Sequence, residues 1–296
     1  MKHEWKITLF LLCLFLFSQF IGLLIVNSYI DQEATLKTGV VTYKNLPYNV
    51  ERPDVSPTES IWYIMIAILV GTAILLVLIK FRKFALWKTW FFLSVLVTLS
   101  FAFSAFINQI AAFILSLVLG LWKVLKPNVY IHNFTEIFIY GGLAAIFVPV
   151  LNVFAASVLL IIISIYDMIA VWQSKHMVKM AEFQTSSNLF SGLFIPKKEQ
   201  KQVEPKIKRK EPGETTYKIS SAVLGGGDMG FPLIFAGVVM KSVGWAAIAI
   251  PICAAIGLLG LMILGQKNKF YPAMPFLSAA CFIGYAISVY VLPGLF

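Results

Sequence analysis

Two aspartates lie within long apolar stretches of this chain. Asp167 is in IISIYDMIAVW, and Asp228 is in VLGGGDMGFPL. On insertion scales a charged side chain at the centre of a bilayer costs about 2.5–3.5 kcal/mol, so an intramembrane carboxylate indicates a functional site by default. Two carboxylates that face each other there should share a proton. Such a pair can activate water, because one carboxylate takes a proton from it while the other protonates a carbonyl oxygen, as in aspartic proteases.

The two aspartates are predicted to lie at similar depth. Lys175 follows Asp167 by eight residues, and Lys218 precedes Asp228 by ten. At 1.5 Å per helical residue these separations are about 12 Å and about 15 Å. Both carboxylates then lie well inside a hydrocarbon core about 30 Å thick. Each aspartate could instead bond a neighbouring helix separately, but the matched depth favours a pair.

Three consecutive glycines, Gly225, Gly226 and Gly227, directly precede Asp228. Glycine within a helix costs about 1 kcal/mol relative to alanine. Small residues let transmembrane helices pack closely, and glycine also lets a substrate backbone approach a carboxylate. The two interpretations are compatible with each other.

The elements that must position these residues are predicted membrane spans. Of the 296 residues 59% are hydrophobic and only 13% are charged, which excludes an ordinary soluble domain. Apolar runs of about 20 residues are each long enough to cross a bilayer. We therefore predict an all-α, polytopic membrane protein with nine transmembrane helices, at approximately 7–30, 61–80, 85–106, 109–125, 134–149, 150–173, 220–240, 243–265 and 272–293.

The distribution of basic residues predicts the orientation of these spans. With the N-terminus in the cytoplasm, nearly all of the 24 Lys and Arg fall on the inside. The exceptions are Lys37, Lys44, Arg52 and Lys241. Cytoplasmic loops carry such an excess, so we expect an N-in, C-out protein of the plasma membrane. The same distribution explains the net charge of +10 without nucleic acid.

The hydrophilic loop divides the chain. We expect an N-terminal helical part over 1–173, a partly disordered cytoplasmic loop over 174–219 and a C-terminal helical part over 220–296. Within the loop, 177–195 is mildly amphipathic and is expected to lie along the interface or cover the site. The segment ETTYKIS, 214–220, could add a strand to an unwound substrate, with an ordinary linker as the alternative.

The remaining acidic residue near a span, Glu136, stands at the start of the fifth predicted helix. We interpret it as a solvated end charge that reaches the cytoplasmic edge.

Three motifs resemble those of the presenilin and signal peptide peptidase family, whose pattern is YD, GxGD and PAL. They stand in order on the sixth, seventh and ninth predicted spans, and the resemblance covers the whole chain. It identifies Asp167 and Asp228 as a catalytic dyad. The residues that match or adjoin the motifs, and are expected to support substrate binding, are Tyr166, Gly225, Gly226 at the variable position, Gly227, Pro272, Ala273, Met274 and Pro275. Met274 departs from the family's leucine, which has a similar volume.

The resemblance implies an intramembrane aspartyl protease that cleaves transmembrane helices by general acid and base catalysis. Prokaryotic relatives, chiefly archaeal, match this size best. The N-in topology is that of presenilin and implies substrates of type I orientation. The resemblance implies no cofactor and no obligatory partner subunit, while an oligomer is compatible with it. The family's hybrid sheet also favours a strand near 214–220.

Two alternatives use similar residues. A proton-coupled transporter or channel also employs broken helices and buried aspartates, but it needs no PA motif. A prepilin-type peptidase also has GxGD, but near the membrane boundary and without this YD and PA arrangement. The sequence has no H-E-x-x-H and no G-x-S-G motif, and His3, His132 and His176 lie in loops or at span ends, so no metal site is predicted.

Overall fold

The fold was obtained as a computed structural model, which describes residues 5–52, 56–81, 83–173, 189–196, 221–265 and 271–292. Seven helical stretches among these residues are long and apolar enough to cross a membrane. The apolar helix Gln109–Leu125 is shorter than these seven. Helices therefore dominate the described chain, as predicted.

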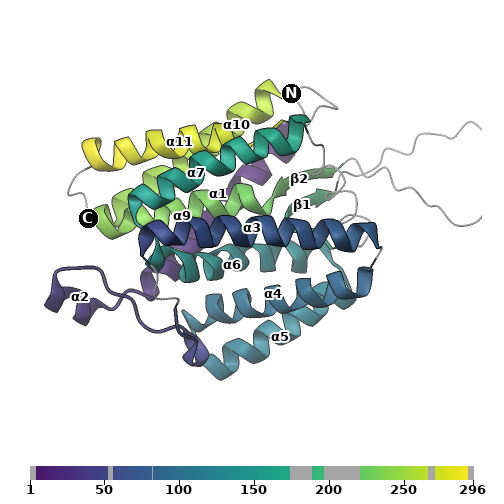
Figure 1. The fold of residues 1–296 in the computed structure, drawn as a ribbon, viewed down its shortest axis with the longest axis horizontal. Coiled ribbons are helices and arrows are strands. Elements are labelled where there is room, and N and C mark those ends of the chain that lie inside the picture. The colour runs from purple at the N-terminus through teal and green to yellow at the C-terminus, as the bar shows by residue number, and fades with distance from the viewer. Residues whose placement is uncertain are drawn as a thin grey trace, which may run out of the picture.

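Ten α-helices, two strands and several short 3-10 or π segments make up the described chain (Figure 1). The α-helices are α1 (Trp5–Ser28), α2 (Gln32–Thr38), α3 (Pro57–Lys80), α4 (Phe84–Ser104), α5 (Gln109–Leu125), α6 (Val129–Phe147), α7 (Val153–Met168), α9 (Gly226–Val243), α10 (Ala249–Leu264) and α11 (Met274–Ala286). The strands are β1 (Gly192–Pro196) and β2 (Ser221–Gly225). The 3-10 segments are η1 (Pro47–Asn49), η2 (Val148–Val150) and η4 (Gly244–Ile248), and the π segments are η3 (Ile169–Gln173) and η5 (Ile287–Val291).

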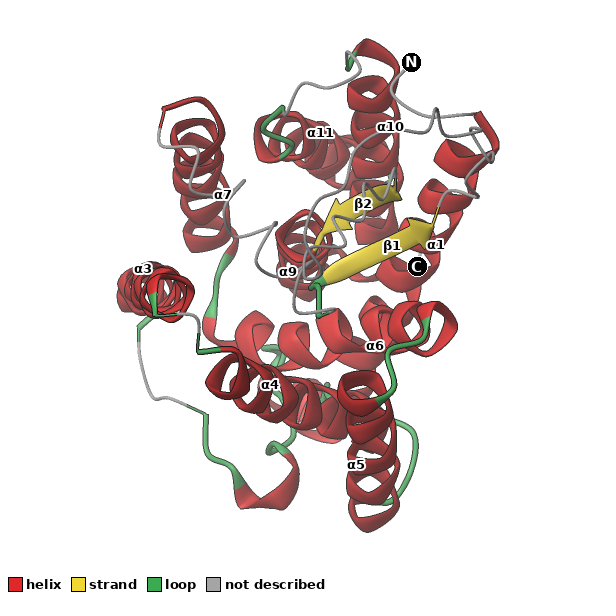
Figure 2. Ribbon diagram, turned by 90° about the vertical axis from the view of Figure 1, so that its right-hand side faces the viewer, coloured by secondary structure: helices red, strands yellow, loops and turns green. Residues whose placement is uncertain are grey.

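Helix α9 forms the centre of the bundle. Every residue from Pro232 to Met240 is buried, as expected for a helix that is apolar all round. Helices α1, α6, α7, α10 and α11 pack around it, as Figure 2 shows. Gly22 of α1 permits one close approach, because a Cβ there would collide with Leu233 of α9.

The apolar stretch Gly226–Leu264 counts as one of the seven candidate membrane spans, although the sequence predicts two spans there. Gly244 interrupts it with φ 58° and ψ −140°, a conformation that favours glycine. Segment η4 follows at this point and leads into α10.

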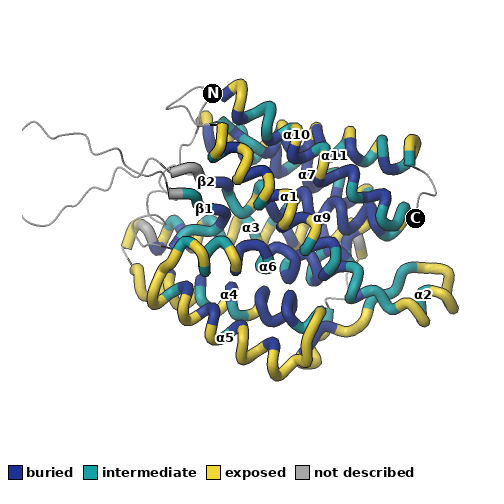
Figure 3. The backbone as a smooth tube through the Cα atoms, turned by 180° about the vertical axis from the view of Figure 1, so that it is seen from behind, coloured by how far each residue is buried: buried dark blue, intermediate teal, exposed yellow. Residues whose placement is uncertain are grey.

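The outer helices expose apolar side chains. Helix α3 presents Trp62, Tyr63, Ile66, Leu69 and Val70 at its surface, and Figure 3 shows the contrast with the buried centre. A continuous apolar surface of this kind suits contact with lipid rather than water.

A two-stranded antiparallel sheet corrects the all-α prediction. Strands β1 and β2 pair with Gly192 opposite Gly225 and Pro196 opposite Ser221. Residues 221–225 were expected to begin a helical span, but they form β2, and the helix begins at Gly226. The sheet lies at one end of the bundle, opposite α2 (Figure 1).

Strand β1 also lies within the loop predicted over 174–219. Its residues 192–195 are extended and do not continue the amphipathic segment predicted over 177–195. The segment 214–220 lies outside the described residues, as does most of that loop.

Candidate active site

Asp167 lies in the last turn of α7 and contacts the start of α11. Its side chain is 7% exposed. Its Oδ2 accepts a hydrogen bond from the backbone N–H of Met274 at 3.1 Å. Met274 is the first residue of α11, whose own N-cap residue, Ala273, provides no side-chain cap. Because the first N–H groups of a helix lack internal partners, Asp167 acts as the missing cap from a neighbouring helix.

Asp228 lies in the first turn of α9 and is partly buried. Its carboxylate accepts from the N–H of Gly225, the N-cap residue of the same helix. This is half of a capping box, in which the third helical residue reaches back to the N-cap. Pro232, one turn later, lacks the N–H that would bind the Asp228 carbonyl, so the helix is loosened just after the carboxylate.

The two aspartates interact electrostatically with each other across α7 and α9. Both carboxylates bind N–H groups at helix N-termini, that of α11 for Asp167 and that of α9 for Asp228. Helix N-termini attract negative charge. The fold therefore brings together the two residues that the sequence predicts as a pair.

The other predicted residues divide by position. Pro272 and Met274 are buried, and Ala273 is partly buried beside Asp167. Pro275 stands in the first turn of α11, where a missing N–H costs nothing. Tyr166 is directed to α3, since its hydroxyl lies 3.3 Å from Thr72 Oγ1.

The three glycines before Asp228 have different surroundings. A Cβ at Gly225 would lie 3.2 Å from Asp228 Oδ2, and one at Gly226 would lie within 2.8 Å of the hydroxyl oxygens of Tyr140 and Ser191. Gly227 is exposed, and a Cβ there would make only ordinary contact with Phe231. Gly226 was assigned to the variable position of the motif, yet in this chain it is tightly enclosed.

Side chains of α6 attach β1 to the bundle. Asn133 binds both backbone groups of Phe194, donating to its carbonyl at 2.8 Å and accepting from its N–H at 2.9 Å. His132 Nε2 lies 2.7 Å from the Gly192 carbonyl, and Glu136 accepts from the Gly192 N–H at 3.0 Å. The outward-facing backbone groups of Gly192 and Phe194 are thus all bound by one helix.

Glu136 does not reach solvent, so its interpretation as a solvated end charge is wrong. It is 1% exposed and forms an ion pair with Lys123 at 2.5 Å. Sequence reasoning also missed Tyr140, which donates to Glu136, and Gln19, which donates to the Met229 carbonyl at 2.8 Å. The available signal was a pair of opposite charges, Lys123 and Glu136, on either side of the short connection between α5 and α6.

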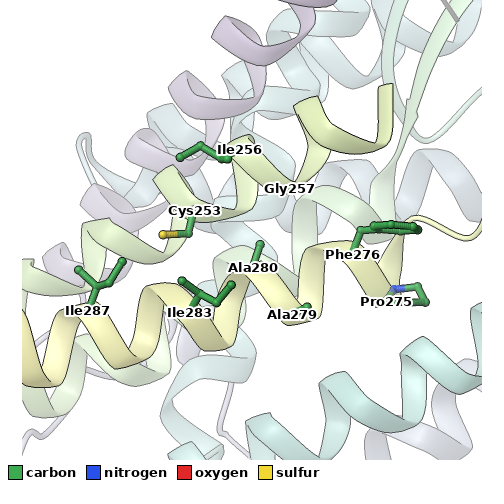
Figure 4. A pocket seen from close by; sticks show the side chains of 9 residues that line it. All are labelled: Cys253, Ile256, Gly257, Pro275, Phe276, Ala279, Ala280, Ile283 and Ile287. Atoms are coloured by element: carbon green, nitrogen blue, oxygen red, sulfur yellow. The ribbon is translucent and has the colours of Figure 1, made fainter. Parts of the chain in front are cut away.

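An apolar cavity of about 530 Å³ lies between α10 and α11 (Figure 4). It is lined by Cys253, Ile256, Gly257, Pro275, Phe276, Ala279, Ala280, Ile283 and Ile287. Cys253 is the titratable side chain among these residues, and no carboxylate or imidazole lines the cavity.

The arrangement suits general acid and base catalysis by two carboxylates. Among the described residues, no three His, Cys, Asp or Glu side chains gather where they could hold a metal ion. The polar groups around the aspartates are backbone N–H groups and hydroxyls, which can orient a carboxylate and a peptide.

Comparison with known proteins gives a family match over nearly the whole chain. The family model described as signal-peptide peptidase, presenilin aspartyl protease matches residues 10–293. None of the curated proteins matches this chain.

Two solved structures share the fold. Both are described as a presenilin family intramembrane aspartate protease, in C222 and P2 space groups, and each is 18% identical to this chain. The first covers 96% of this chain and 98% of its own, with a TM-score of 0.58. The second covers 98% of this chain and 100% of its own, with a TM-score of 0.61.

Proposed function

The chain belongs to the signal peptide peptidase and presenilin family of intramembrane aspartyl proteases, and we propose that Asp167 and Asp228 are its catalytic pair. The observation that carries this proposal is their placement on the packed helices α7 and α9, close enough to interact electrostatically, with each carboxylate bound to a backbone N–H at a helix N-terminus. One carboxylate takes a proton from a water molecule as that water attacks the scissile carbonyl carbon, while the other, protonated, gives its proton to the carbonyl oxygen. When the tetrahedral intermediate collapses, the first aspartate passes the proton taken from water to the leaving amine, and the second regains a proton from a hydroxyl of the intermediate.

The substrate is a transmembrane helix that must unwind, because a helix keeps its carbonyls in hydrogen bonds. The freed backbone of the substrate needs hydrogen-bonding partners. The outer edge of β1 cannot provide them at Gly192 and Phe194, because side chains of α6 already bind the N–H and C=O groups of these two residues. Backbone groups alternate between the two edges of a strand. With Leu193 and Ile195 facing β2, the outward groups of β2 are those of Ser221, Val223 and Gly225.

Strand β2 is therefore the edge that we assign to the substrate. The Gly225 N–H on this edge binds Asp228. A substrate strand added at Val223 would pass beside that carboxylate, and Val223 is 42% exposed. Main-chain pairing explains how varied sequences can be held, because it depends little on side chains.

The family is multi-pass and membrane-integral, and we further propose nine spans in a plasma membrane with the N-terminus inside and the C-terminus outside. Seven candidate spans become nine when the shorter helix α5 is counted as a span and when the stretch Gly226–Leu264 is divided at Gly244 into two. Nearly all Lys and Arg then face the cytoplasm, with the exception of Lys37, Lys44, Arg52 and Lys241. Substrates of type I orientation follow from this topology. Under the same proposal, each helical part contributes one aspartate, Asp167 from residues 1–173 and Asp228 from residues 220–296, and the loop over 174–219 connects the two parts. We also propose that the protein needs no partner subunit for activity.

The transporter alternative is not favoured. Family membership supports proteolysis, and α11 contributes its first N–H to Asp167, a contact that fits a protease with a PA motif.

The central experiment incubates the purified protein in liposomes with a type I transmembrane peptide. The wild type should cleave the peptide, and a transition-state inhibitor of aspartyl proteases should block cleavage. Asp167→Asn and Asp228→Asn should each reduce turnover by at least about 100-fold, since general acid or base catalysis contributes 10²- to 10⁴-fold. Asparagine retains the shape and the acceptor oxygen, so folding should persist. Wild-type turnover by either variant would overturn the assignment of the pair.

A second experiment tests the edge of β2. Val223→Pro removes one outward N–H while leaving the ladder with β1 intact, and proline is tolerated on strand edges. Cleavage should fall and KM should rise, whereas the matched Val223→Ala variant, which keeps the N–H, should cleave more like the wild type. Equal behaviour of the two variants would exclude substrate pairing at this residue.

A further inference from the structure

A buried ion pair lies between α5 and α6, outside the pair of aspartates. Lys123 Nζ is 2.5 Å from Glu136 Oε1, and both side chains are 1% exposed. Lys123 also donates to Thr135 Oγ1 at 2.9 Å, and its Nζ lies 5.6 Å from the centre of the Phe91 ring. Removing two charges from water is costly, so a buried ion pair is weak evidence for stability. Its role is better sought in the groups that it holds in place.

The Glu136 carboxylate connects the ion pair to the sheet. Its Oε2 accepts from the Tyr140 hydroxyl and, at 3.0 Å, from the Gly192 N–H. Glu136 therefore binds donors from α5, from its own helix and from the first residue of β1. A charged acceptor makes stronger hydrogen bonds than a neutral one, and Lys123 supplies the counter-charge to Glu136 at 2.5 Å.

Tyr140 extends this network to the turn before Asp228. An ideal Cβ at Gly226 would lie 2.8 Å from Tyr140 Oη and 2.7 Å from Ser191 Oγ, so both hydroxyls pack against that glycine. The Gly226 N–H donates to the Ser191 carbonyl at 3.2 Å. Tyr140 also interacts with Ser191 and, electrostatically, with Asp228. The chain of contacts that begins at Lys123 thus ends at Gly226, two residues before Asp228.

We propose that Lys123, Glu136 and Tyr140 are positioning residues, which fix β1 and the Gly225–Gly226 turn and thereby hold Asp228 against Asp167. The inference rests on the proposed function of the two aspartates. Lys123 holds the Glu136 carboxylate in place through the ion pair, Glu136 fixes Gly192 and the Tyr140 hydroxyl, and Tyr140 fixes Gly226. The three act through the backbone of the turn and do not meet the substrate.

The first test is Tyr140→Phe, which removes one hydroxyl and retains the ring. A small displacement of a reacting group can cost about 100-fold, and we expect kcat to fall by about 10- to 100-fold on this basis, with a smaller change in KM. The limbs of the pH–rate profile should also move, because the turn no longer holds Asp228 at the same position relative to Asp167. Glu136→Gln, which keeps the size but removes the charge, should show the same pattern with a larger loss of stability.

Tyr29→Phe is the matched control. The Tyr29 hydroxyl is also buried and donates to the Phe101 carbonyl at 2.7 Å, in a contact between α4 and the residue after α1 that does not involve the sheet. This variant should lose a similar amount of thermal stability but keep the kcat and the pH profile of the wild type. If both variants lost kcat equally, the effect would be one of stability, and the positioning role would be overturned.

A coupling experiment tests the last link. Gly226→Ala places a methyl group against Tyr140 and Ser191, so it should impair cleavage strongly. In a Tyr140→Phe/Ser191→Ala background both hydroxyls are absent, and the same substitution should cause a smaller further loss. Contacting residues show this non-additivity, whereas independent ones do not. Equal losses in the two backgrounds would overturn the link from Tyr140 to the turn.

The two proposals fail separately. Activity in Asp167→Asn and Asp228→Asn would remove the catalytic pair itself. Inactive aspartate variants, together with a Tyr140→Phe variant that behaves like Tyr29→Phe, would remove only the positioning role.

Discussion

The carboxylate of Asp167 accepts a hydrogen bond from the backbone N–H of Met274, 3.1 Å away. This contact joins the end of α7 to the start of α11. It shows that the segment with the PA motif, Pro272 and Ala273, is followed directly by the backbone N–H that binds Asp167. Pro272 and Pro275 flank a short backbone segment whose first helical N–H is left for Asp167. The motif therefore acts through its backbone on one of the two carboxylates.

The side chain of Met274 should contribute to this contact through packing. It is 3% exposed, so Met274→Ala should leave a cavity and reduce the free energy of unfolding by about 2–5 kcal/mol. Cleavage should fall as well, because the N–H beside Asp167 is no longer held firmly. Met274→Leu restores the volume and should stay near wild-type activity. Thermal unfolding and peptide cleavage measure both effects, and a Met274→Leu variant as impaired as Met274→Ala would contradict the packing argument.

A pair of serines should hold α7 and α11 in register beside that contact. The hydroxyl oxygens of Ser164 and Ser278 are 2.8 Å apart, and they lie 2.8 Å and 3.4 Å from the Leu160 carbonyl oxygen. Each hydroxyl has one proton, so one serine can donate to Leu160 while the other donates to its neighbouring serine. Hydrogen bonds between membrane helices contribute about 0.6 kcal/mol on average and up to about 1.7 kcal/mol. Each Ser→Ala variant should lose stability in this range, and the double variant should lose less than the sum. Strict additivity in reversible unfolding would show that the two hydroxyls do not cooperate.

The sequence could reveal the aspartates because each is a carboxylate isolated in an apolar run, a signal that does not depend on tertiary contacts. It could not reveal β2. A short apolar run of strand has the same composition as the start of a span, and periodicity does not separate the two. The strand is fixed by its partner β1, and β1 is in turn fixed by Asn133 and His132 of α6.

The error at Glu136 has a similar cause. A charge near a span end can usually reach water, and only the packing of α5 against α6 places Lys123 beside it. Separations along the chain predict depth, but they do not predict which neighbouring helix supplies a counter-charge. The residues that support the site were therefore less predictable than the residues proposed to react.

Catalysis by one acid and one base predicts a bell-shaped dependence of kcat/KM on pH. Activity should decline at low pH, where the base becomes protonated, and at high pH, where the acid loses its proton. The two limbs should appear within about pH 4 to pH 9 in liposomes, and they report the pair rather than either aspartate alone. A flat profile over this range, with the protein still folded, would argue against a shared proton.

Gly227 should serve the substrate rather than the fold. It is the exposed glycine of the three before Asp228, and a Cβ there would meet only Phe231, at an ordinary distance of 3.5 Å. Gly227→Ala should therefore fold normally, and alanine favours the helix by up to about 1 kcal/mol. The added methyl group projects from the open side of the turn, where a substrate backbone would approach Asp228. We expect KM to rise and kcat/KM to fall without loss of thermal stability. Gly260→Ala is the matched control, because a Cβ on that residue of α10 meets nothing within 4 Å. If the two variants cleaved the peptide equally well, the open side of Gly227 would not be the path of the substrate.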